Sequence, residues 1–250
     1  MSDMKQTFKP IFSSNGNVNK NAYLNWRMSQ SSPWYNFNAI ADGYRDAALT
    51  LARSCLEDQY KISKKADELI FPILFNANHA IELYLKSMMW EIYLLENNLK
   101  DKYDGGHDIR QLFKAVQKMI ADVSDRYGFT DDKKNIKTEL ANTEDYINEL
   151  FLLLHPETNG VPQSKENLDF SRYPVNKAKE PYFYSKDSDK NVTVDIENFI
   201  NRFTEIGNNL SCIDGYYGSL LYRKMEYEVD IQREYENEMM ADMYRTGFEW

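Results

Sequence analysis

The chain has 250 residues, of which 42% are hydrophobic and 14% aromatic, so it can bury a full core and is not a disordered chain. Its 30 basic and 39 acidic side chains give a net charge of −9, which argues against a protein that coats nucleic acid through a broad basic surface. A local basic cleft is still compatible with this charge. The two cysteines form neither a disulfide framework nor a metal-type pair, which fits a reducing compartment.

Helical periodicity dominates the first part of the chain. Residues 1–35 are rich in Asn and Ser, and we expect them to form an irregular arm. Apolar residues then recur every three or four positions, which predicts helices over about 37–55, 66–98, 109–127 and 140–154. Pro72 lies either inside the first turns of the second helix or at its true start.

The helical pattern breaks after the fourth helix. From His155 to about Asp195, prolines among polar residues predict a long loop, with a small hairpin near residues 181–194. Asp195 is placed to cap a fifth helix whose apolar stripe continues to Leu210. A last helical segment follows, from about Tyr216 toward Tyr244.

These elements predict a mainly α protein, an up-and-down helical bundle with a loop or hairpin insertion and a helical extension. The expected parts are the N-terminal arm (1–35), the bundle (36–213) with its insertion (155–194), and an acidic helical tail (214–250). The tail holds 4 basic and 9 acidic residues, together with tyrosines and methionines that suit protein contacts. Packing of this tail on its own bundle is an equally ordinary interpretation.

The sequence gives no sign of a membrane segment or of a bound cofactor. The longest apolar stretch, Ile70–Leu95, is interrupted by charged residues, and the start "MSDMKQTFKPIF" has no apolar leader, so we expect a cytoplasmic chain. It contains no phosphate loop, no Gly-x-Gly-x-x-Gly, no His-Glu-x-x-His and no Gly-x-Ser-x-Gly. We therefore expect neither a cofactor nor a metal ion.

A row of ionisable residues interrupts the apolar helix "FNANHAIELYLKSMMW". His79, Glu82 and Lys86 are three and four positions apart, so they share one face. In one interpretation Glu82 and Lys86 form a helix-stabilising pair with His79 as a neighbour. In the other, the row lines a cleft, because buried charges on so apolar a helix require partners.

Two further motifs offer such partners. In "GGHDIRQLF", His107 and Asp108 lie at a helix start, where Asp108 either simply caps the helix or helps to form a site. In "DFSRYP", Arg172 and Tyr173 precede a proline. Arg172 either pairs with Glu82 or Asp108, or presents its guanidinium to a phosphate.

The stretch "FPILFNANHAIELYLKSMMW", followed by "GHDIRQLF" and "FSRYP", resembles bacterial helical proteins with a HEPN domain (higher eukaryotes and prokaryotes nucleotide-binding). The resemblance covers roughly residues 37–211. It implies a bundle of four or five helices that dimerises, and a setting in bacterial conflict such as phage defence or toxin systems.

Many members of that superfamily are metal-independent ribonucleases that use an Arg followed, after four to six residues, by a His. The eligible positions before the three histidines, at 72–74, 100–102 and 148–150, hold no arginine. The sequence thus departs from the motif that carries the usual activity.

The sequence leaves three candidate functions. One is a HEPN-like component of a defence or toxin system that binds a nucleotide or RNA phosphate, or a partner protein, at a polar cleft. Alternatives are an RNA-cleaving enzyme with a non-standard site and a non-catalytic oligomerising scaffold. The candidate catalytic residues are His79, Glu82, Lys86, His107 and Arg172, and the candidate binding residues are Asn78, Asp108 and Tyr173.

We expect Arg172 and Tyr173 to fold back over the helix that carries His79, with His107 at the neighbouring helix start. We also expect a homodimer or higher homo-oligomer with the 75–90 helix near its interface. RNA or a nucleotide, and a protein bound through 214–250, are the other expected partners, and no membrane contact is expected.

Overall fold

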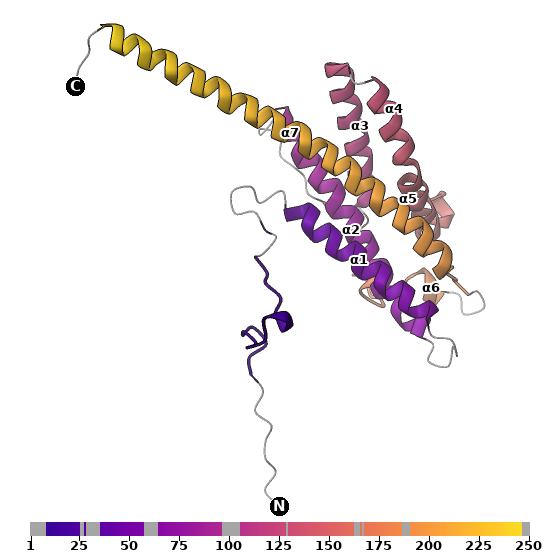
Figure 1. Cartoon of the computed structure of the whole chain (residues 1–250). Helices are drawn as coiled ribbons and strands as arrows, with labels where there is room; N and C mark the ends of the chain where they lie inside the picture. The colour runs from indigo at the N-terminus through magenta and orange to yellow at the C-terminus, as the bar shows by residue number, and fades with distance from the viewer. Residues whose placement is uncertain are drawn as a thin grey trace, which may run out of the picture.

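The computed structural model describes residues 9–25, 28, 36–57, 65–96, 106–128, 130–162, 166, 168–186 and 191–246. Within these residues the chain is mainly α-helical, as the periodicity predicts, and its strand pairing is limited to one isolated bridge. The helices (Figure 1) are α1 (Asn36–Leu56), α2 (Lys65–Leu95), α3 (Ile109–Tyr127), α4 (Thr130–Glu139), α5 (Ala141–Leu154), α6 (Phe183–Lys186) and α7 (Ile196–Thr246).

Helix α2 is the inner helix of the bundle and packs against α1, α3 and α7. Its sequence is apolar on nearly every side, which is typical of a helix enclosed by others. Between Ile73 and Ile92 most of its side chains are buried, including Glu82, Lys86 and Glu91. Pro72 lies inside the helix, which selects the first of its two predicted placements. The predicted end near residue 98 falls outside the described residues.

Close approach between α7 and its neighbours depends on two glycines. A Cβ atom at Gly207 would lie 2.4 Å from the side chain of Arg45 on α1, and one at Gly218 would lie 2.9 Å from Glu91 Oε1 on α2. Alanines on α1, such as Ala48, are fully buried and likewise keep its surface flat. Small residues therefore set how closely these three helices approach.

The predicted fourth helix, over 140–154, corresponds to α5, and it is preceded by a further helix, α4, that the periodicity did not predict. The chain turns at Leu140 between α4 and α5, and Leu140 is itself buried. The apolar residues that predicted one stripe over 140–154 lie on α5, whereas α4 is polar and packs mainly against α3 and α7.

The hairpin predicted near residues 181–194 is wrong for the described part of that segment. Residues 183–186 form the single helical turn α6, and residues 191–195 are neither helix nor strand. The aromatic side chains pack on the bundle instead of alternating across a ladder, with Tyr184 against Phe71 at 5.1 Å between ring centroids. The isolated bridge joins Val175 to Pro181, and the predicted hairpin tip, 187–190, lies outside the described residues.

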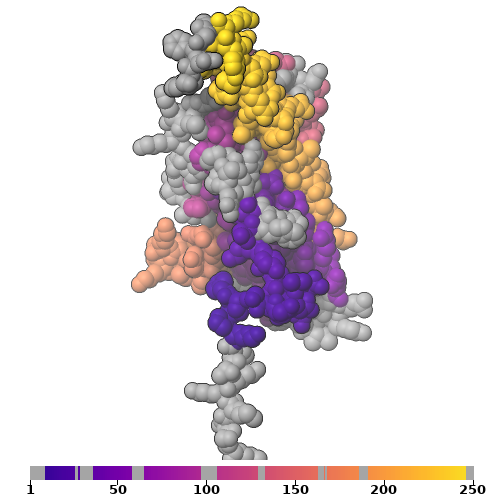
Figure 2. Space-filling model, turned by 60° about the vertical axis from the view of Figure 1, so that its left-hand side comes forward, coloured from indigo at the N-terminus to yellow at the C-terminus, as the bar shows by residue number. Residues whose placement is uncertain are grey.

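The two last predicted helical segments are one helix, α7, of 51 residues. Asp195 caps it as predicted, since its Oδ1 accepts the N–H of Asn198 at 3.0 Å. Burial continues to Leu221 instead of ending at the predicted bundle boundary of residue 213. Beyond it, every side chain described from 225 to 245 is exposed, and this half of α7 projects past the bundle (Figures 1 and 2).

The described part of the N-terminal arm is exposed and irregular apart from one 3-10 turn, Val18–Lys20, in agreement with the sequence prediction. Among the described helices, none has the length and apolar character needed to cross a membrane.

Two buried acids meet where α2 and α7 cross. Glu91 is 4% exposed and Asp214 is 2% exposed, and Asp214 accepts a hydrogen bond from Asn38 on α1. Burial, and then the charge of Asp214, raises the pKa of Glu91 to about 9. Burial raises the pKa of Asp214 to about 6. Since both native-state pKa values lie above the ordinary range, the folded chain holds these protons more tightly than the unfolded chain.

The first prediction concerns stability against pH. The stabilisation that these two protons give the folded state is complete below about pH 4. It is lost as the pH rises through 6 and then through 9. We expect the Tm of the Glu91→Gln variant to exceed that of the wild type by roughly 5 °C at pH 8 and to match it near pH 5. Thermal unfolding followed by circular dichroism at 222 nm measures the Tm at each pH, with the variant at an exposed site, Glu234→Gln, as control. Parallel wild-type and Glu91→Gln profiles would contradict the prediction.

Candidate functional site

The side chain of Glu82 is the centre of a polar cluster on α2. Its Oε1 lies 2.6 Å from Lys86 Nζ and 2.9 Å from His107 Nδ1, and its Oε2 lies 3.6 Å from His79 Nδ1. The row therefore shares one face, as its spacing predicts, and the segment before α3 brings His107 to the same carboxylate. Both Glu82 and Lys86 have side chains only 9% exposed.

Glu82 is held as a carboxylate. Burial alone would raise its pKa, but the interactions with His79, Lys86 and His107 outweigh burial and lower the pKa of Glu82 to about 2. A carboxylate accepts hydrogen bonds and donates none, so Nδ1 is the protonated nitrogen of His107 in this contact. In the neutral imidazole the other ring nitrogen, Nε2, carries the lone pair, and the His107 side chain is 62% exposed.

Asp108 fixes the position of His107. It is the N-cap of α3, where its Oδ1 accepts the backbone N–H groups of Arg110 and Gln111. Its Oδ2 accepts the backbone N–H of Glu166 at 3.1 Å, which ties the loop after α5 to the start of α3. Both oxygens are thus engaged by the chain and Asp108 lies outside the pocket lining, so the geometry favours its capping role over ligand binding.

Arg172 approaches the cluster from the loop. It follows the 3-10 turn η4 (Asp169–Ser171), which contacts α2. Its guanidinium carbon lies 5.7 Å from the ring centroid of Phe75 on α2, one helical turn before His79. The predicted return of Arg172 to this helix is confirmed. Its predicted ion pair with Glu82 or Asp108 is wrong, because the nearer carboxylate, three residues earlier in the same turn, is Asp169.

Tyr173 lies at the margin of this arrangement. Its ring contacts the guanidinium of Arg172 at 5.7 Å, yet the residue is 55% exposed and does not line the pocket. It therefore supports Arg172 from outside, and it does not fold over the end of α2 as the sequence predicts.

These groups surround a small cavity of about 100 Å³, which we call the His–Glu pocket. Its lining side chains come from α2, α3, the segment before α3 and the η4 turn: Phe75, Asn78, His79, Glu82, His107, Ile109, Leu168, Ser171 and Arg172. The ring of His79 is held by Tyr44, edge-on at 4.4 Å, and by Phe75, stacked at 5.7 Å. The pocket has room for a small polar group.

Asn78 adds an unsatisfied donor to this pocket. The residue is 5% exposed, and its Oδ1 accepts the hydroxyl of Tyr146 on α5 at 2.8 Å. Its Nδ2 has no hydrogen-bond partner among the described residues. A buried N–H group without a partner costs about 1–3 kcal/mol, so packing alone does not account for this amide beside the pocket.

The third histidine lies elsewhere. His155 ends α5, and its Nε2 is 3.1 Å from Glu166 Oε2. His155 is thus a residue of the helix end and of the loop that follows. Among the described residues, no three His, Cys, Asp or Glu side chains are arranged as metal ligands.

The fold and the pocket together define an all-α bundle with a buried carboxylate that binds two imidazoles and a lysine. No protein-family model matches the chain, and neither a curated protein nor a solved structure matches it. The similarity to HEPN domains therefore rests on the short motifs alone, and the function is argued from the pocket.

The second prediction tests whether Glu82 holds the cluster together. Removing its charge by Glu82→Gln leaves Lys86 buried without a counter-charge, so we expect the free energy of unfolding at pH 7 to fall by about 3 kcal/mol. The double variant Glu82→Gln/Lys86→Met removes the stranded charge and regains most of this loss. Urea unfolding measures both, with the exposed Glu68→Gln on the same helix as control. Equal stability of Glu82→Gln and Glu68→Gln would show that the pair contributes nothing.

Proposed function

We propose that the His–Glu pocket binds a phosphate group of RNA or of a nucleotide, and that the chain is a HEPN-like component of a bacterial defence or toxin system. The observation that carries the first part is that three residues with N–H donors line one small pocket. Asn78 Nδ2, the guanidinium of Arg172 and the imidazole of His107 belong to residues that line it. Guanidinium and N–H donors are the groups that bind phosphate in proteins.

The carboxylate in the pocket does not oppose an anion. Lys86 Nζ lies 2.6 Å from Glu82 Oε1 and offsets the charge of this carboxylate. Both side chains are nearly buried, and Lys86 is not part of the pocket lining. Arg172 is 41% exposed on its side chain and is paired with one acid, which leaves N–H groups for a ligand.

A second candidate, metal-independent RNA cleavage, is favoured by the Glu82–His107 contact of 2.9 Å. With Nδ1–H donated to Glu82, His107 Nε2 takes the proton of an RNA 2′-hydroxyl while the 2′ oxygen bonds to phosphorus. The P–O5′ bond then breaks, and the leaving 5′ oxygen takes a proton from the imidazolium of His79. Arg172 stabilises the charge on the phosphoryl oxygens. The products are a 2′,3′-cyclic phosphate and a 5′-hydroxyl.

We also propose that the chain self-associates, but through a surface other than the 75–90 helix that the sequence suggested. The α2 row needs no second copy to bury it, because α1, α3 and α7 of the same chain enclose that helix. The exposed half of α7 instead carries two apolar groups at three- and four-residue spacing, Tyr222, Met225 and Val229 and then Met239 and Met243, which together we call the α7 row. We propose this row as the contact for a second copy of the chain.

The third prediction tests phosphate binding through Arg172. We expect Arg172→Ala to weaken binding of 5′-AMP at least tenfold, which corresponds to about 1.4 kcal/mol, as measured by isothermal titration calorimetry at pH 6.5. Arg233→Ala is the matched control, because Arg233 also pairs with an Asp three residues earlier but lies on the exposed half of α7. Equal affinities of the two variants would contradict the phosphate site.

The fourth prediction tests the cleavage candidate. In EDTA, we expect the wild type to release cyclic-phosphate ends from a single-stranded RNA and His107→Ala to lose at least 100-fold of that rate. His155→Ala, which breaks the His155–Glu166 contact outside the His–Glu pocket, should keep full activity. Circular dichroism checks that both variants fold. A wild type that binds RNA without cleaving it, or an active His107→Ala, would exclude this chemistry and leave the binding function.

A further inference from the structure

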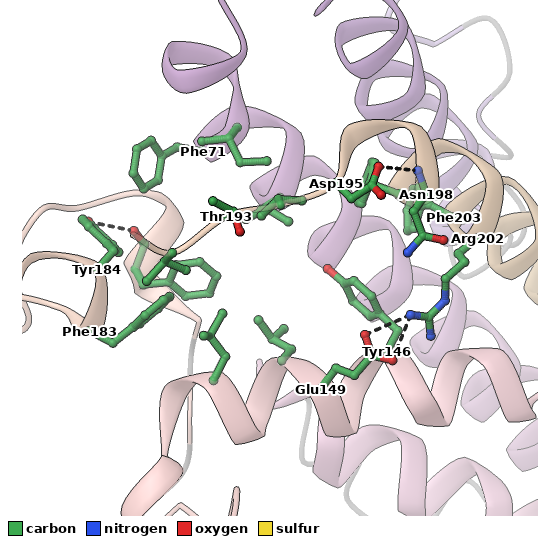
Figure 3. Close-up of a pocket in the computed structure, with 18 residues that line it drawn as sticks. Phe71, Tyr146, Glu149, Phe183, Tyr184, Thr193, Asp195, Asn198, Arg202 and Phe203 are labelled. Carbon is green, nitrogen blue, oxygen red and sulfur yellow. Dashed lines mark hydrogen bonds and ion pairs between the residues drawn. The ribbon is translucent and has the colours of Figure 1, made fainter. Parts of the chain in front are cut away.

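A second and larger cavity lies where α2, α5 and the start of α7 meet the 168–195 segment (Figure 3). Its volume is about 290 Å³. Most of its lining is aromatic or aliphatic, and it includes Phe71, Leu74, Leu153, Phe183, Tyr184 and Phe203. We call it the apolar cavity.

The aromatic side chains leave this space open because they pack along its walls. Phe199 stacks on Phe203 at 5.2 Å, and Phe170 meets Phe183 edge-to-face at 5.5 Å. Each ring thus pairs with a neighbour on the same wall. The space is partly open to solvent, because Leu153, Val192 and Val194 of its lining are exposed.

The size and chemistry of the lining identify a class of ligand. An apolar cavity of about 150 Å³ stays dry and binds benzene, so about twice that volume suits a molecule of two fused rings. Binding pockets for small molecules are mostly apolar and start at about 300 Å³, which places this cavity at the small end of that range.

The polar groups at one end specify an uncharged ligand. Arg202 Nη1 donates to both carboxylate oxygens of Glu149, at 2.8 and 2.9 Å, so its charge is already matched. The carboxylate of Asp195 caps α7. Tyr146, on the floor, directs its hydroxyl away to Asn78. Arg202, the one cation among the described lining residues, is already paired with Glu149, so an anionic ligand would lose hydration without gaining an unpaired counter-ion.

From these observations we propose that the apolar cavity is a binding site for an uncharged small molecule of about two aromatic rings. The cavity is separate from the His–Glu pocket but shares a wall with it. The 168–172 segment gives Phe170 to one and Arg172 to the other, and the Tyr146–Asn78 hydrogen bond joins the two. The binding claim does not depend on the proposed phosphate function.

The test, our fifth prediction, uses indole as the probe and the full chain labelled with ¹³C on Ile, Leu and Val methyl groups. We expect saturable methyl shifts at Leu74, Leu153 and Val194, with a Kd below about 1 mM, and none at Leu152. Indole-3-acetate, which carries a charge, should bind at least tenfold more weakly.

Adjacent leucines on α5 supply a matched pair of variants. Leu153 lines the cavity and is 40% exposed, whereas Leu152 is 48% exposed and lies outside the lining. Leu153→Trp fills the cavity with its own indole ring and should abolish the shifts, while Leu152→Trp should leave the affinity unchanged. If Leu153→Trp fails to fold, Val194→Trp replaces it.

Three outcomes would overturn the proposal. The first is the lack of saturable shifts in the wild type. The second is equal binding by Leu152→Trp and the cavity-filling variant. The third is binding of the charged analogue as tightly as indole. None of these outcomes bears on 5′-AMP affinity, so a failure here is distinguishable from a failure of the phosphate site.

Discussion

The enclosure of α2 by three helices is the constraint on which the rest of the structure depends. Because α1, α3 and α7 exclude water from this helix, each ionisable group on it must find a partner or change its protonation. Two glutamates on α2 meet this constraint in opposite ways. Glu82 faces Lys86 and two imidazoles and stays ionised, whereas Glu91 faces Asp214 and holds its proton.

The same enclosure separates stabilising groups from groups available to a ligand. The Glu82–Lys86 pair lies deep and supports the helix, while His107 and Arg172 lie nearer to solvent at the mouth of the pocket. Both interpretations of the row, a structural pair and a polar cleft, therefore describe part of one arrangement. The carboxylate orients an imidazole, and the lysine keeps that carboxylate from repelling an anion.

The loop between α5 and α7 connects the two cavities. Its η4 turn places Phe170 toward the apolar cavity and is followed at once by Arg172 at the His–Glu pocket. Asn78 is held on one side by Tyr146, a wall of the apolar cavity, and lines the His–Glu pocket on the other. A ligand in either cavity contacts side chains that are packed against the lining of the other.

The sequence by itself determined the helices and part of the site. Periodicity located α1, α2, α3 and α5, and the spacing of His79, Glu82 and Lys86 placed them on one face, because these are local properties of a helix. The capping roles of Asp108 and Asp195 were equally local. A single α7 was not predicted, although the apolar stripe continues through Leu210, Ile213, Tyr217 and Leu221; Gly215 and Gly218, which are weak helix formers, oppose that signal.

Only the tertiary structure decided which distant groups meet. The sequence contained Arg172 and Asp169 together but could not show that this short-range pair would prevail over one with Glu82. It named Asn78 as a candidate binding residue but marked no role for Tyr146, whose hydroxyl on α5 holds Asn78 on α2. The apolar cavity likewise had no sequence signal, since its aromatic residues read as ordinary core and loop. Contacts across the chain depend on how helices pack in space, and a pattern of spacings along the chain does not contain that information.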